Sequence, residues 1–345
     1  MEPNSAYVLR PAKLEDLPSL VDLVSHLTDS ITSIPQDKEF LEKRIHKSLR
    51  AFYPNIDQAG DEQYLFVLEG PEGIVGTSAI IARVGGFQPF YTYKIERENF
   101  ANADLKLEKS HPTLTLKASH DGPTEIGSLY LRPDCRHSGL GRLLSLGRFL
   151  FIARFPKRFR SQILAELRGF LDEQGKSPFW EQVAKPFFEQ EFSEADFLSG
   201  LGNKSFIRDL MPRHPLYTEL LPQEVQSVIG RVHNHTAPAK AILEREGFEA
   251  IEEVDIFDAG PILQASRGSV RCLKEARSYE IESLVPESEL SNSPWLAANG
   301  QLDYKACITS ADTQEDSCSL SEVAASSLGL QAGDTVWLTP LFPKS

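Results

Sequence analysis

The stretch from Glu125 to Phe155, EIGSLYLRPDCRHSGLGRLLSLGRFLFIARF, decides the fold that we expect for this chain. Apolar residues alternate with other residues over Glu125–Leu131, which predicts a strand, and Pro133 marks its end. The residues from Arg142 to Phe155 are mostly apolar and predict a long helix. The stretch therefore predicts a strand, a turn with two glycines and a helix in direct succession.

The turn between this strand and this helix has the pattern R-x-x-G-x-G, from Arg136 through Gly139 to Gly141. Backbone N–H groups at a helix N-terminus lack partners within the helix and lie at the positive end of its dipole, so they attract phosphate. Glycines let a ligand approach the backbone closely, and Arg136 and Arg142 would add positive charge. Taken alone, the pattern is equally typical of an ordinary strand-to-helix turn, and it matches neither the dinucleotide fingerprint nor the Walker loop.

The composition is that of an ordinary globular protein. The 345 residues suffice for one large domain or two, with 41% hydrophobic and 25% charged residues. The net charge of −13 argues against a nucleic-acid partner held by a basic surface. An acidic surface suits a cationic small substrate, although solubility explains the charge equally well.

Four cysteines without paired spacing predict neither a metal site nor structural disulfides, and they favour a reducing compartment. Cys135 lies beside the glycine turn, where we expect a small buried side chain rather than a reactive thiol. The N-terminus shows no basic region before an apolar core, and no apolar run approaches the ~18 residues of a membrane span. We therefore expect a cytoplasmic protein with no membrane contact.

Upstream of the glycine turn, the periodicity predicts a first strand, two helices and further strands that pair in an antiparallel run. The expected elements are strands at Tyr7–Arg10, Tyr64–Leu68, Ile74–Val84 and Thr113–Lys117, and helices from Leu17 to Val24 and from Asp37 to Phe52. We expect Phe87–His111 to be an aromatic and polar insert between two of these strands.

Downstream of the predicted long helix, the chain contains a series of short, specific words. They are AELRG (Ala165–Gly169), SPFW (Ser177–Trp180), ADFLSG (Ala195–Gly200), LMP (Leu210–Pro212), VH (Val232–His233), DIFD (Asp255–Asp258) and GP (Gly260–Pro261). These words are part of a resemblance to the bacterial arginine N-succinyltransferases, which covers roughly residues 6 to 275. The glycine turn likewise resembles the acyl-coenzyme A pyrophosphate loop of the GNAT superfamily of N-acetyltransferases.

The resemblance implies an α+β fold, a GNAT-like mixed sheet flanked by helices, with a large helical insertion at about residues 156–230. A helix over Pro238–Phe248 that ends at Gly247 would follow the insertion, and after it a strand through Val254 to Phe257. We expect residues 1–275 to form this acyltransferase-like domain. Residues 276–345 would form a small acidic β-rich domain, with a partly disordered acidic tail as the alternative.

The resemblance also implies a reaction, the transfer of succinyl from the cosubstrate succinyl-CoA to the α-amine of L-arginine in arginine catabolism, with no metal. The implied partners are L-arginine and succinyl-CoA, in an enzyme that is a homo-oligomer or is paired with a homologous subunit. Two alternatives stay open. One is a succinyltransferase subunit that prefers ornithine, and the other is a non-catalytic partner or sensor subunit on the same fold.

Several site residues follow from the resemblance, position by position. The histidine of the Val-His-x-x-Thr segment, His233, would donate the proton that the departing CoA thiolate needs, while His235 would be structural. Leu129 would contact succinyl-CoA through the strand backbone, and its side chain is equally typical of a core. The implied pyrophosphate-binding residues are Arg136, Gly139, Gly141 and Arg142.

The charged ends of the two substrates each need a partner of opposite charge. Arg168 is a candidate for the succinyl carboxylate, with Arg83 as a second candidate. Glu166 is a candidate for the arginine guanidinium, and Thr32 and Ser33 would contact the amino acid as well. Further available carboxylates, each more typical of a surface charge when taken singly, are Asp172, Glu181, Asp255 and Asp258.

Overall fold

The computed structural model describes residues 6–25, 34, 36–136, 139–200 and 204–343. Its strands are β1 (Val8–Pro11), β2 (Gln63–Gly70), β3 (Gly73–Ile81), β4 (Phe90–Asn102), β5 (Leu107–Ser119), β6 (Thr124–Leu131), β7 (Gln162–Glu166), β8 (Leu216–Tyr217), β9 (Glu249–Val254), β10 (Pro261–Ser266), β11 (Arg277–Val285), β12 (Pro294–Ala298), β13 (Ala306–Thr313), β14 (Ser317–Ser321) and β15 (Thr335–Pro340). They join in one sheet, in the order β12-β15-β11-β14-β13-β1-β2-β3-β6-β7-β10-β9-β4-β5-β8.

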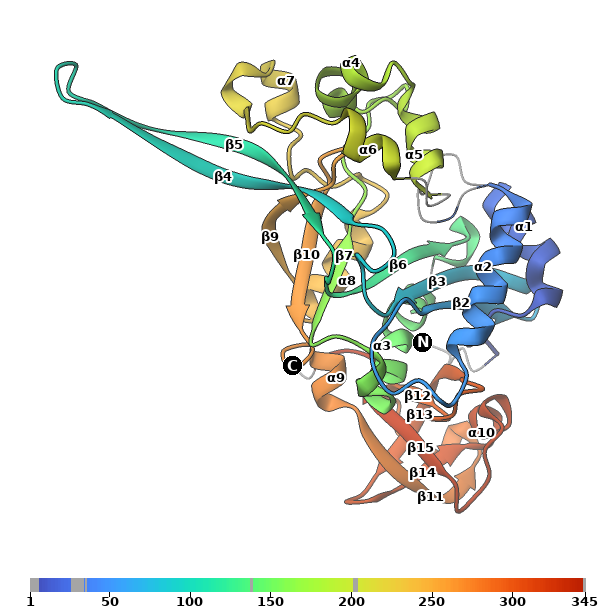
Figure 1. Ribbon diagram of the computed structural model, residues 1–345. Helices are drawn as coiled ribbons and strands as arrows, with labels where there is room; N and C mark the ends of the chain where they lie inside the picture. The colour runs from blue at the N-terminus through green and yellow to red at the C-terminus, as the bar shows by residue number, and fades with distance from the viewer. Residues whose placement is uncertain (1–5, 26–33, 35, 137–138, 201–203, 344–345) are drawn as a thin grey trace.

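Helices lie on both sides of this sheet and over its ends (Figure 1). They are α1 (Leu17–Ser25), α2 (Lys38–Ala51), α3 (Leu140–Arg154), α4 (Lys185–Phe188), α5 (Phe192–Gly200), α6 (Ser205–Leu210), α7 (Gln223–Gln226), α8 (Ala237–Arg245), α9 (Arg271–Glu275) and α10 (Glu322–Leu328). The strand, turn and helix predicted over Glu125–Phe155 are therefore confirmed as β6 and α3, and the helices predicted near the N-terminus are confirmed as α1 and α2.

The central strands need cover on both faces because their apolar side chains alternate between two cores. On β2, Tyr64 and Phe66 are buried on the α3 side, where the rings of Phe66 and Phe151 lie 5.7 Å apart. Leu65 and Val67 are buried on the opposite face with side chains of α1 and α2. The sheet is thus the middle layer of this part of the molecule.

Strands β6 and β7 are parallel to each other, although each is antiparallel to its other neighbour. The ladder between them contains only the pairs Thr124↔Ile163 and Glu125↔Leu164, at their N-terminal ends. Beyond these pairs, β6 stays with β3 and β7 stays with β10. The two strands therefore separate toward their C-terminal ends, and we call this feature the β6/β7 splay.

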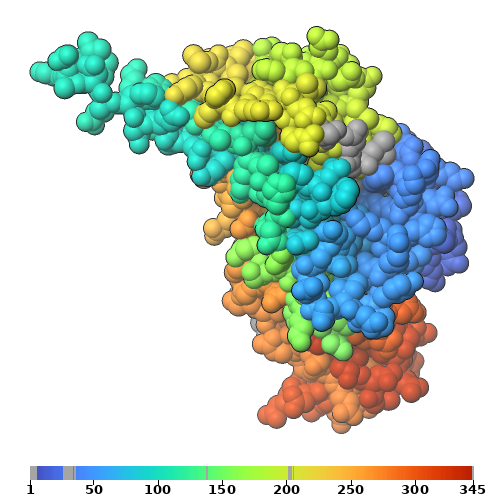
Figure 2. Space-filling model, in the orientation of Figure 1, coloured from blue at the N-terminus to red at the C-terminus, as the bar shows by residue number. Residues whose placement is uncertain are grey.

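The sequence predicts an insert at Phe87–His111 without assigning its structure, and most of these residues form regular strands. They belong to a long hairpin of β4 and β5, which projects from the body of the molecule (Figures 1 and 2). Near its tip, Phe100 and Leu105 are exposed on the ribbon. The outer part of this ribbon has solvent on both faces and needs no apolar alternation, whereas Tyr91 and Tyr93 at its base are buried and alternate with polar residues.

The strand predicted after Gly247 is present as β9, but its predicted end at Phe257 is too far along the chain. Strand β9 ends at Val254, and the chain turns over Asp255–Asp258 before β10 begins. The Asp255 carboxylate accepts hydrogen bonds from the backbone N–H groups of Phe257 at 2.7 Å and Asp258 at 2.9 Å. This local capping by an aspartate competes with continuation of the strand.

The predicted insertion contains α4 to α7 in the described part of residues 156–230, together with β7 and the short β8. Aromatic side chains form its core, where the rings of Trp180 and Phe188 stack with centroids 5.5 Å apart. Phe192 is buried in the same core, whereas Phe187 and Phe197 are exposed. The insertion therefore packs as a small domain-like unit over one end of the sheet (Figure 1).

The C-terminal strands β11 to β15 and α10 surround a core of their own. They nevertheless continue the sheet, because Leu9 of β1 pairs with Ala306 of β13. The buried Tyr304 hydroxyl also donates a hydrogen bond to the carbonyl of Gly147 in α3, at 2.6 Å. The division into two domains near residue 275 stays a prediction, since strand pairing crosses it.

Candidate active site

A β-bulge interrupts the ladder between β3 and β6 beside the splay. The register shifts after the pair Ala79↔Gly127, so two residues of β6, Ser128 and Leu129, oppose one residue of β3. Ser128 has a φ of +52°, which residues with a side chain seldom adopt. A bulge places an extra peptide unit outside the regular ladder. The backbone of β6 is therefore redirected where β6 and β7 separate.

The glycine turn after β6 ends at the N-terminus of α3. Gly139 precedes the helix with a φ of +84°, and an added Cβ there would approach Ile308 to 3.4 Å. An added Cβ on Gly141 would have no described atom within 4 Å, so this side of the helix start is open. The N–H groups of Leu140 and Gly141 belong to the first turn, which has no intrahelical acceptors. The turn thus presents backbone donors beside an uncrowded surface.

Arginine side chains surround this helix start. The guanidinium of Arg142 lies over the ring of Phe342, 4.7 Å from its centroid, and its Nη1 is buried with no hydrogen-bond partner among the described residues. Burial lowers the pKa of Arg142, and the charge of the exposed Arg245 lowers it further. Arg136 is exposed and donates from Nε to the carbonyl of Leu131 at 3.0 Å. An anion bound here would meet several positive charges.

Four carboxylates gather near the C-terminal end of β7. Burial raises the pKa of Glu166 well above its ordinary value, and the charges of Glu125, Asp255 and Asp258 raise it further. Burial raises the pKa of Asp255 to about 7, and Asp258 contributes to that shift. Burial also raises the pKa of Glu125. We call Glu125, Glu166, Asp255 and Asp258 the acidic cluster, and burial favours the protonated form of the three carboxyls whose pKa it raises.

Two cations lie near this cluster. Lys204 and Arg44 both lower the pKa of Glu125, against the effect of its burial. Arg44 extends from α2 and donates to the Ser128 hydroxyl at 2.5 Å. Burial lowers the pKa of Arg44 to about 10, and Glu125 opposes that shift, so the guanidinium stays charged at neutral pH. The acidic cluster and the bulge are therefore linked electrostatically.

Arg168 follows β7 and lies in a carboxylate network. Its two terminal nitrogens donate to the buried Asp196, at 2.9 and 3.3 Å, and one lies 3.4 Å from Asp258. Its guanidinium also lies 4.8 Å from the centroid of the Phe192 ring. Burial alone would lower the pKa of Arg168, but the two carboxylates raise it overall. The side chain is fixed in one orientation by these contacts.

His233 is fixed beside Arg168 by the main chain. The His233 backbone N–H donates to the carbonyl of Arg168 at 2.8 Å, and Val232 forms an isolated bridge with Gly169. Its Nδ1 accepts the backbone N–H of His235 at 3.2 Å, and the two rings are edge to face with centroids 5.0 Å apart. The ring is half-buried. In the tautomer that this contact favours, Nε2 carries the proton.

Comparison with known proteins identifies the family. Residues 7–272 match the family described as arginine N-succinyltransferase beta subunit, and residues 279–340 match the C-terminal domain of that subunit. The chain belongs to the arginine N-succinyltransferase beta subunit family. The resemblance seen in the sequence is thereby confirmed.

Relatives in this family match the chain over nearly its whole length. It is 40% identical to the arginine N-succinyltransferase of Yersinia pseudotuberculosis, and 38% identical to that of Shigella flexneri, with 97% of each chain covered in both cases. The solved structure of arginine/ornithine succinyltransferase subunit AI from Pseudomonas aeruginosa is 34% identical and has a TM-score of 0.89. That match covers 98% of this chain and 99% of the other, and it confirms the predicted α+β fold.

In this family member, the predicted site residues fall into two groups along the splay. One group lies from the bulge to the start of α3, and consists of Leu129, Arg136, Gly139, Gly141 and Arg142. The other group lies at the end of β7 and just beyond it, and consists of Glu166, Arg168 and His233. Thr32 and Ser33 lie outside the described residues. The Leu129 side chain is half-buried against the α3 core, so only its backbone is suited to a ligand contact.

The other candidates named from the sequence have ordinary local roles, apart from Asp255 and Asp258. Arg83 pairs with Asp61 at 3.1 Å and with Asp121 at 3.3 Å. Asp172 accepts hydrogen bonds from backbone N–H groups of its own turn. Glu181 pairs with Lys185 one helical turn away. These contacts do not connect with the acidic cluster.

Sequence reasoning missed Glu125, Arg44, Lys204 and Asp196 as neighbours of the site. The sequence could have indicated Glu125, because it lies in a strand that is expected to be buried, and a buried carboxylate needs a polar or charged partner. The other three lie on helices or at their ends, where a charged residue is ordinary. Only the packing of those helices against the sheet brings them near β6 and β7.

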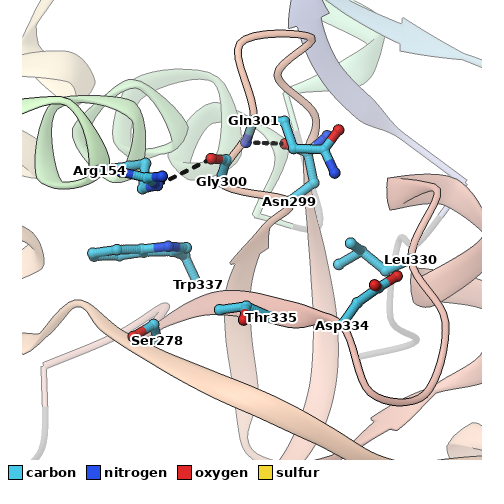
Figure 3. Close-up of a pocket in the computed structure, with 9 residues that line it drawn as sticks. All are labelled: Arg154, Ser278, Asn299, Gly300, Gln301, Leu330, Asp334, Thr335 and Trp337. Carbon is cyan, nitrogen blue, oxygen red and sulfur yellow. Dashed lines mark hydrogen bonds between the residues drawn. The ribbon is translucent and has the colours of Figure 1, made fainter.

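A separate pocket of about 400 Å³ lies in the C-terminal part of the molecule (Figure 3). It includes Trp337 of β15 and Arg154, the last residue of α3. Arg154 Nε already donates to the Gly300 carbonyl at 3.1 Å, and the Asn299 side chain accepts the Gln301 N–H at 3.2 Å. The glycine turn is at the other end of α3, about 20 Å away for a helix of this length. The pocket is therefore separate from the glycine turn.

Two further searches cover the described ranges alone. Among those residues, no group of three His, Cys, Asp or Glu side chains is arranged to hold a metal ion. No helix within the same ranges has the length and apolar character needed to cross a membrane. All four cysteines are free and buried, and burial raises the pKa of Cys135, as a packing role for this residue predicts.

Proposed function

We propose that this chain is an acyltransferase that moves succinyl from succinyl-CoA to the α-amine of L-arginine. One observation supports this most directly. The splay between two parallel strands has a phosphate-suited helix start on the β6 side and the acidic cluster at the end of β7. Relatives 38–40% identical over nearly the whole chain are arginine N-succinyltransferases.

The coenzyme would enter along β6. Its pantetheine amides would pair with the β6 backbone at Leu129, within the bulge, where ladder pairing to β7 has ended. Its diphosphate would rest on the N–H groups of Leu140 and Gly141. Arg136 and Arg142 would neutralise the phosphates, and the buried Nη1 of Arg142 would gain an acceptor that it lacks within the described residues.

The acceptor amino acid would bind at the end of β7. Its guanidinium would lie against Glu166, whose carboxyl shares its surroundings with Glu125 and Asp255. A charge-assisted hydrogen bond of this kind contributes about 1.5–3 kcal/mol. Arg168 remains our candidate for the succinyl carboxylate, and its paired contacts with Asp196 would fix the direction of its guanidinium.

The chemistry is a nucleophilic substitution at the thioester carbonyl. The neutral α-amine attacks this carbon and forms the C–N bond, and the tetrahedral intermediate then expels the CoA sulfur. The nitrogen loses a proton and the thiolate gains one. His233 carries a proton on Nε2 in the favoured tautomer. Nε2 would donate this proton to sulfur and take up the proton that the nitrogen loses, so the ring ends neutral.

Substrate preference and assembly also belong to this proposal. Ornithine remains the alternative acceptor, because the solved structure with a TM-score of 0.89 is an arginine/ornithine succinyltransferase subunit. That protein is a subunit, which supports assembly of this chain with itself or with a homologous chain. Buried free cysteines are consistent with a cytoplasmic location.

The test is an assay of free thiol release with purified protein and each of four pairs, succinyl-CoA or acetyl-CoA with arginine or ornithine. We expect the fastest release with succinyl-CoA and arginine. Faster release with ornithine would change the acceptor, and faster release with acetyl-CoA would change the donor. No release with any pair would favour the non-catalytic partner subunit.

A further inference from the structure

Arg148 is a buried cation in the middle of α3, only 2% exposed. Its Nη1 donates to the carbonyl of Ala79 at 2.9 Å and to the carbonyl of Gly127 at 3.1 Å. Its Nε donates to the Ser145 carbonyl at 3.1 Å. Among the described residues, no acidic side chain forms an ion pair with it. Its charge is therefore balanced by carbonyl dipoles alone.

The position of Arg148 is specific with respect to the bulge. Ala79 and Gly127 are the cross-strand pair directly before the register shift, and one nitrogen of Arg148 contacts both carbonyls. On the opposite face of the sheet, Arg44 donates to the Ser128 hydroxyl. The strained Ser128 backbone, at a φ of +52°, is thus held between two buried arginines. Such strain persists only where the surroundings fix it.

A buried arginine is costly when an apolar side chain would fill the same space. Burial lowers the pKa of Arg148 to about 9, so it still carries its charge at neutral pH. A hydrogen bond to the Gly127 carbonyl also polarises the peptide unit that joins Gly127 to Ser128. Inside the protein the positive charge of Arg148 is weakly screened. It lies on the α3 side of the β6 backbone, and a thioester carbonyl bound along that backbone would gain negative charge in the reaction.

We propose that Arg148 is a positioning residue for acyl transfer, which holds the bulge so that the β6 backbone at Ser128–Leu129 faces the thioester carbonyl. The role rests on the proposed function, because it requires an acyl-CoA in the splay. Arg148 acts through the β6 backbone and through its field, and it does not touch the substrate. Its loss therefore affects turnover more than substrate binding.

The chain offers a matched control in Arg158. It is 4% exposed, and it also donates to backbone carbonyls, those of Ala51 at 3.0 Å and Tyr53 at 2.8 Å. Its partners are at the end of α2 and in the following loop, away from the bulge. Arg148→Met and Arg158→Met therefore remove equivalent buried cations, and only the first removes a contact to β6. Arg148→Lys retains the charge but cannot contact all three carbonyls.

The experiment compares kcat, both KM values and CoA affinity for these three variants, with hydrogen exchange of segment 124–131. We expect Arg148→Met to lower kcat about 10–100-fold, with KM values and CoA affinity within about 3-fold, and to speed exchange in this segment. Arg148→Lys should recover part of kcat. Arg158→Met should retain the wild-type kcat, and hydrogen exchange over 124–131 should stay as slow as in the wild type, even if this variant melts at a lower temperature.

The outcomes separate the two proposals. An inactive wild-type protein would overturn the proposed function. An active wild-type protein with equal kcat for Arg148→Met and Arg158→Met would overturn the role of Arg148 alone. Unchanged exchange over 124–131 in Arg148→Met would overturn it too, with or without activity. If Arg148→Met does not fold, Arg148→Lys provides the test instead. A wild-type kcat together with wild-type hydrogen exchange in Arg148→Lys would refute the proposal.

Discussion

Glu125 of β6 and Glu166 of β7 lie on adjacent parallel strands, and the negative charge of Glu125 raises the pKa of Glu166. Glu125 pairs in register with Leu164, and Glu166 is two residues further along the same strand, so both glutamates belong to one face of the sheet. Two neighbouring buried carboxyl groups, those of Glu125 and Glu166, favour the binding of a cationic ligand. The predictions below follow from this arrangement and from the glycine turn.

The first prediction concerns recognition of the guanidinium. Glu166→Gln preserves the shape of the side chain and removes its charge, so we expect the KM for arginine to rise about 10–150-fold. The KM for succinyl-CoA should change little. Steady-state kinetics with each substrate varied provides the measurement. Glu181→Gln, which affects only a pair with Lys185, is the control, and an equal effect of the two changes would contradict the assignment.

The second prediction concerns protons that leave when a guanidinium binds. A cation beside Glu166 and Asp255 lowers the pKa values that burial has raised, so the carboxyls lose protons on binding. We expect binding of 5-guanidinopentanoate, which lacks the α-amine, to release protons at pH 7 and to strengthen between pH 6 and pH 8. Calorimetry in two buffers of different ionisation enthalpy measures the release. Binding heats that do not depend on the buffer would refute the prediction.

The third prediction concerns stability and pH. The pKa of Asp255 is raised to about 7 in the folded protein, so the folded state keeps this proton at a pH where the unfolded chain has lost it. The contribution of this group to stability is therefore full below the unfolded pKa and is lost as pH rises through about 7.

Asp255→Asn retains the oxygen that accepts two backbone N–H groups and removes the charge. We expect this variant to be more stable than the wild type by about 1–3 kcal/mol at pH 8, and by less at pH 5. Urea unfolding at the two pH values measures the difference. A gain that is larger at pH 5 would show that the sign is wrong.

The fourth prediction separates ligand approach from folding in the glycine turn. Gly141→Ala adds a methyl group where no described atom lies within 4 Å, so the fold should tolerate it while the KM for succinyl-CoA rises about tenfold. Gly268→Ala is the matched control, since its Cβ would also meet no described atom, and both KM values should stay unchanged. Gly139→Ala should lower stability by about 1–3 kcal/mol because of its positive φ. Thermal melts and kinetics of all three variants test these expectations.

The fifth prediction concerns proton transfer to sulfur. We expect His233→Ala to lower kcat about 10²–10⁴-fold and to leave CoA binding intact, because the side chain is needed only as the thiolate departs. His235→Ala is the comparison, and it should cost much less, since the backbone N–H of residue 235, which donates to His233 Nδ1, is retained in this variant. If turnover survives in His233→Ala, another group donates the proton.

Local pattern was sufficient wherever neighbours along the chain decide the structure. The alternation over β6, the glycines before α3 and the apolar run within α3 appear as predicted, because strand and helix periods are set over a few residues. Gly247 follows α8 with a positive φ, as is common where a local sequence ends a helix. Of the hairpin of β4 and β5, only the part at Thr113–Lys117 was predicted as a strand, and the outer part of the ribbon is exposed and offers no apolar alternation.

The sequence by itself determined the family, the α+β class and the order of strand, glycine turn and helix, since these are recorded in contiguous words. The tertiary structure alone decided that Glu125 meets Glu166, and that Arg44 and Arg148 hold the Ser128 bulge from opposite faces of the sheet. Parallel pairing and helix packing bring these residues together across long stretches of chain, and their spacing in the sequence carries no trace of such contacts. The physical reason is that a buried charge can be balanced by any partner within a few ångströms, wherever that partner lies along the chain.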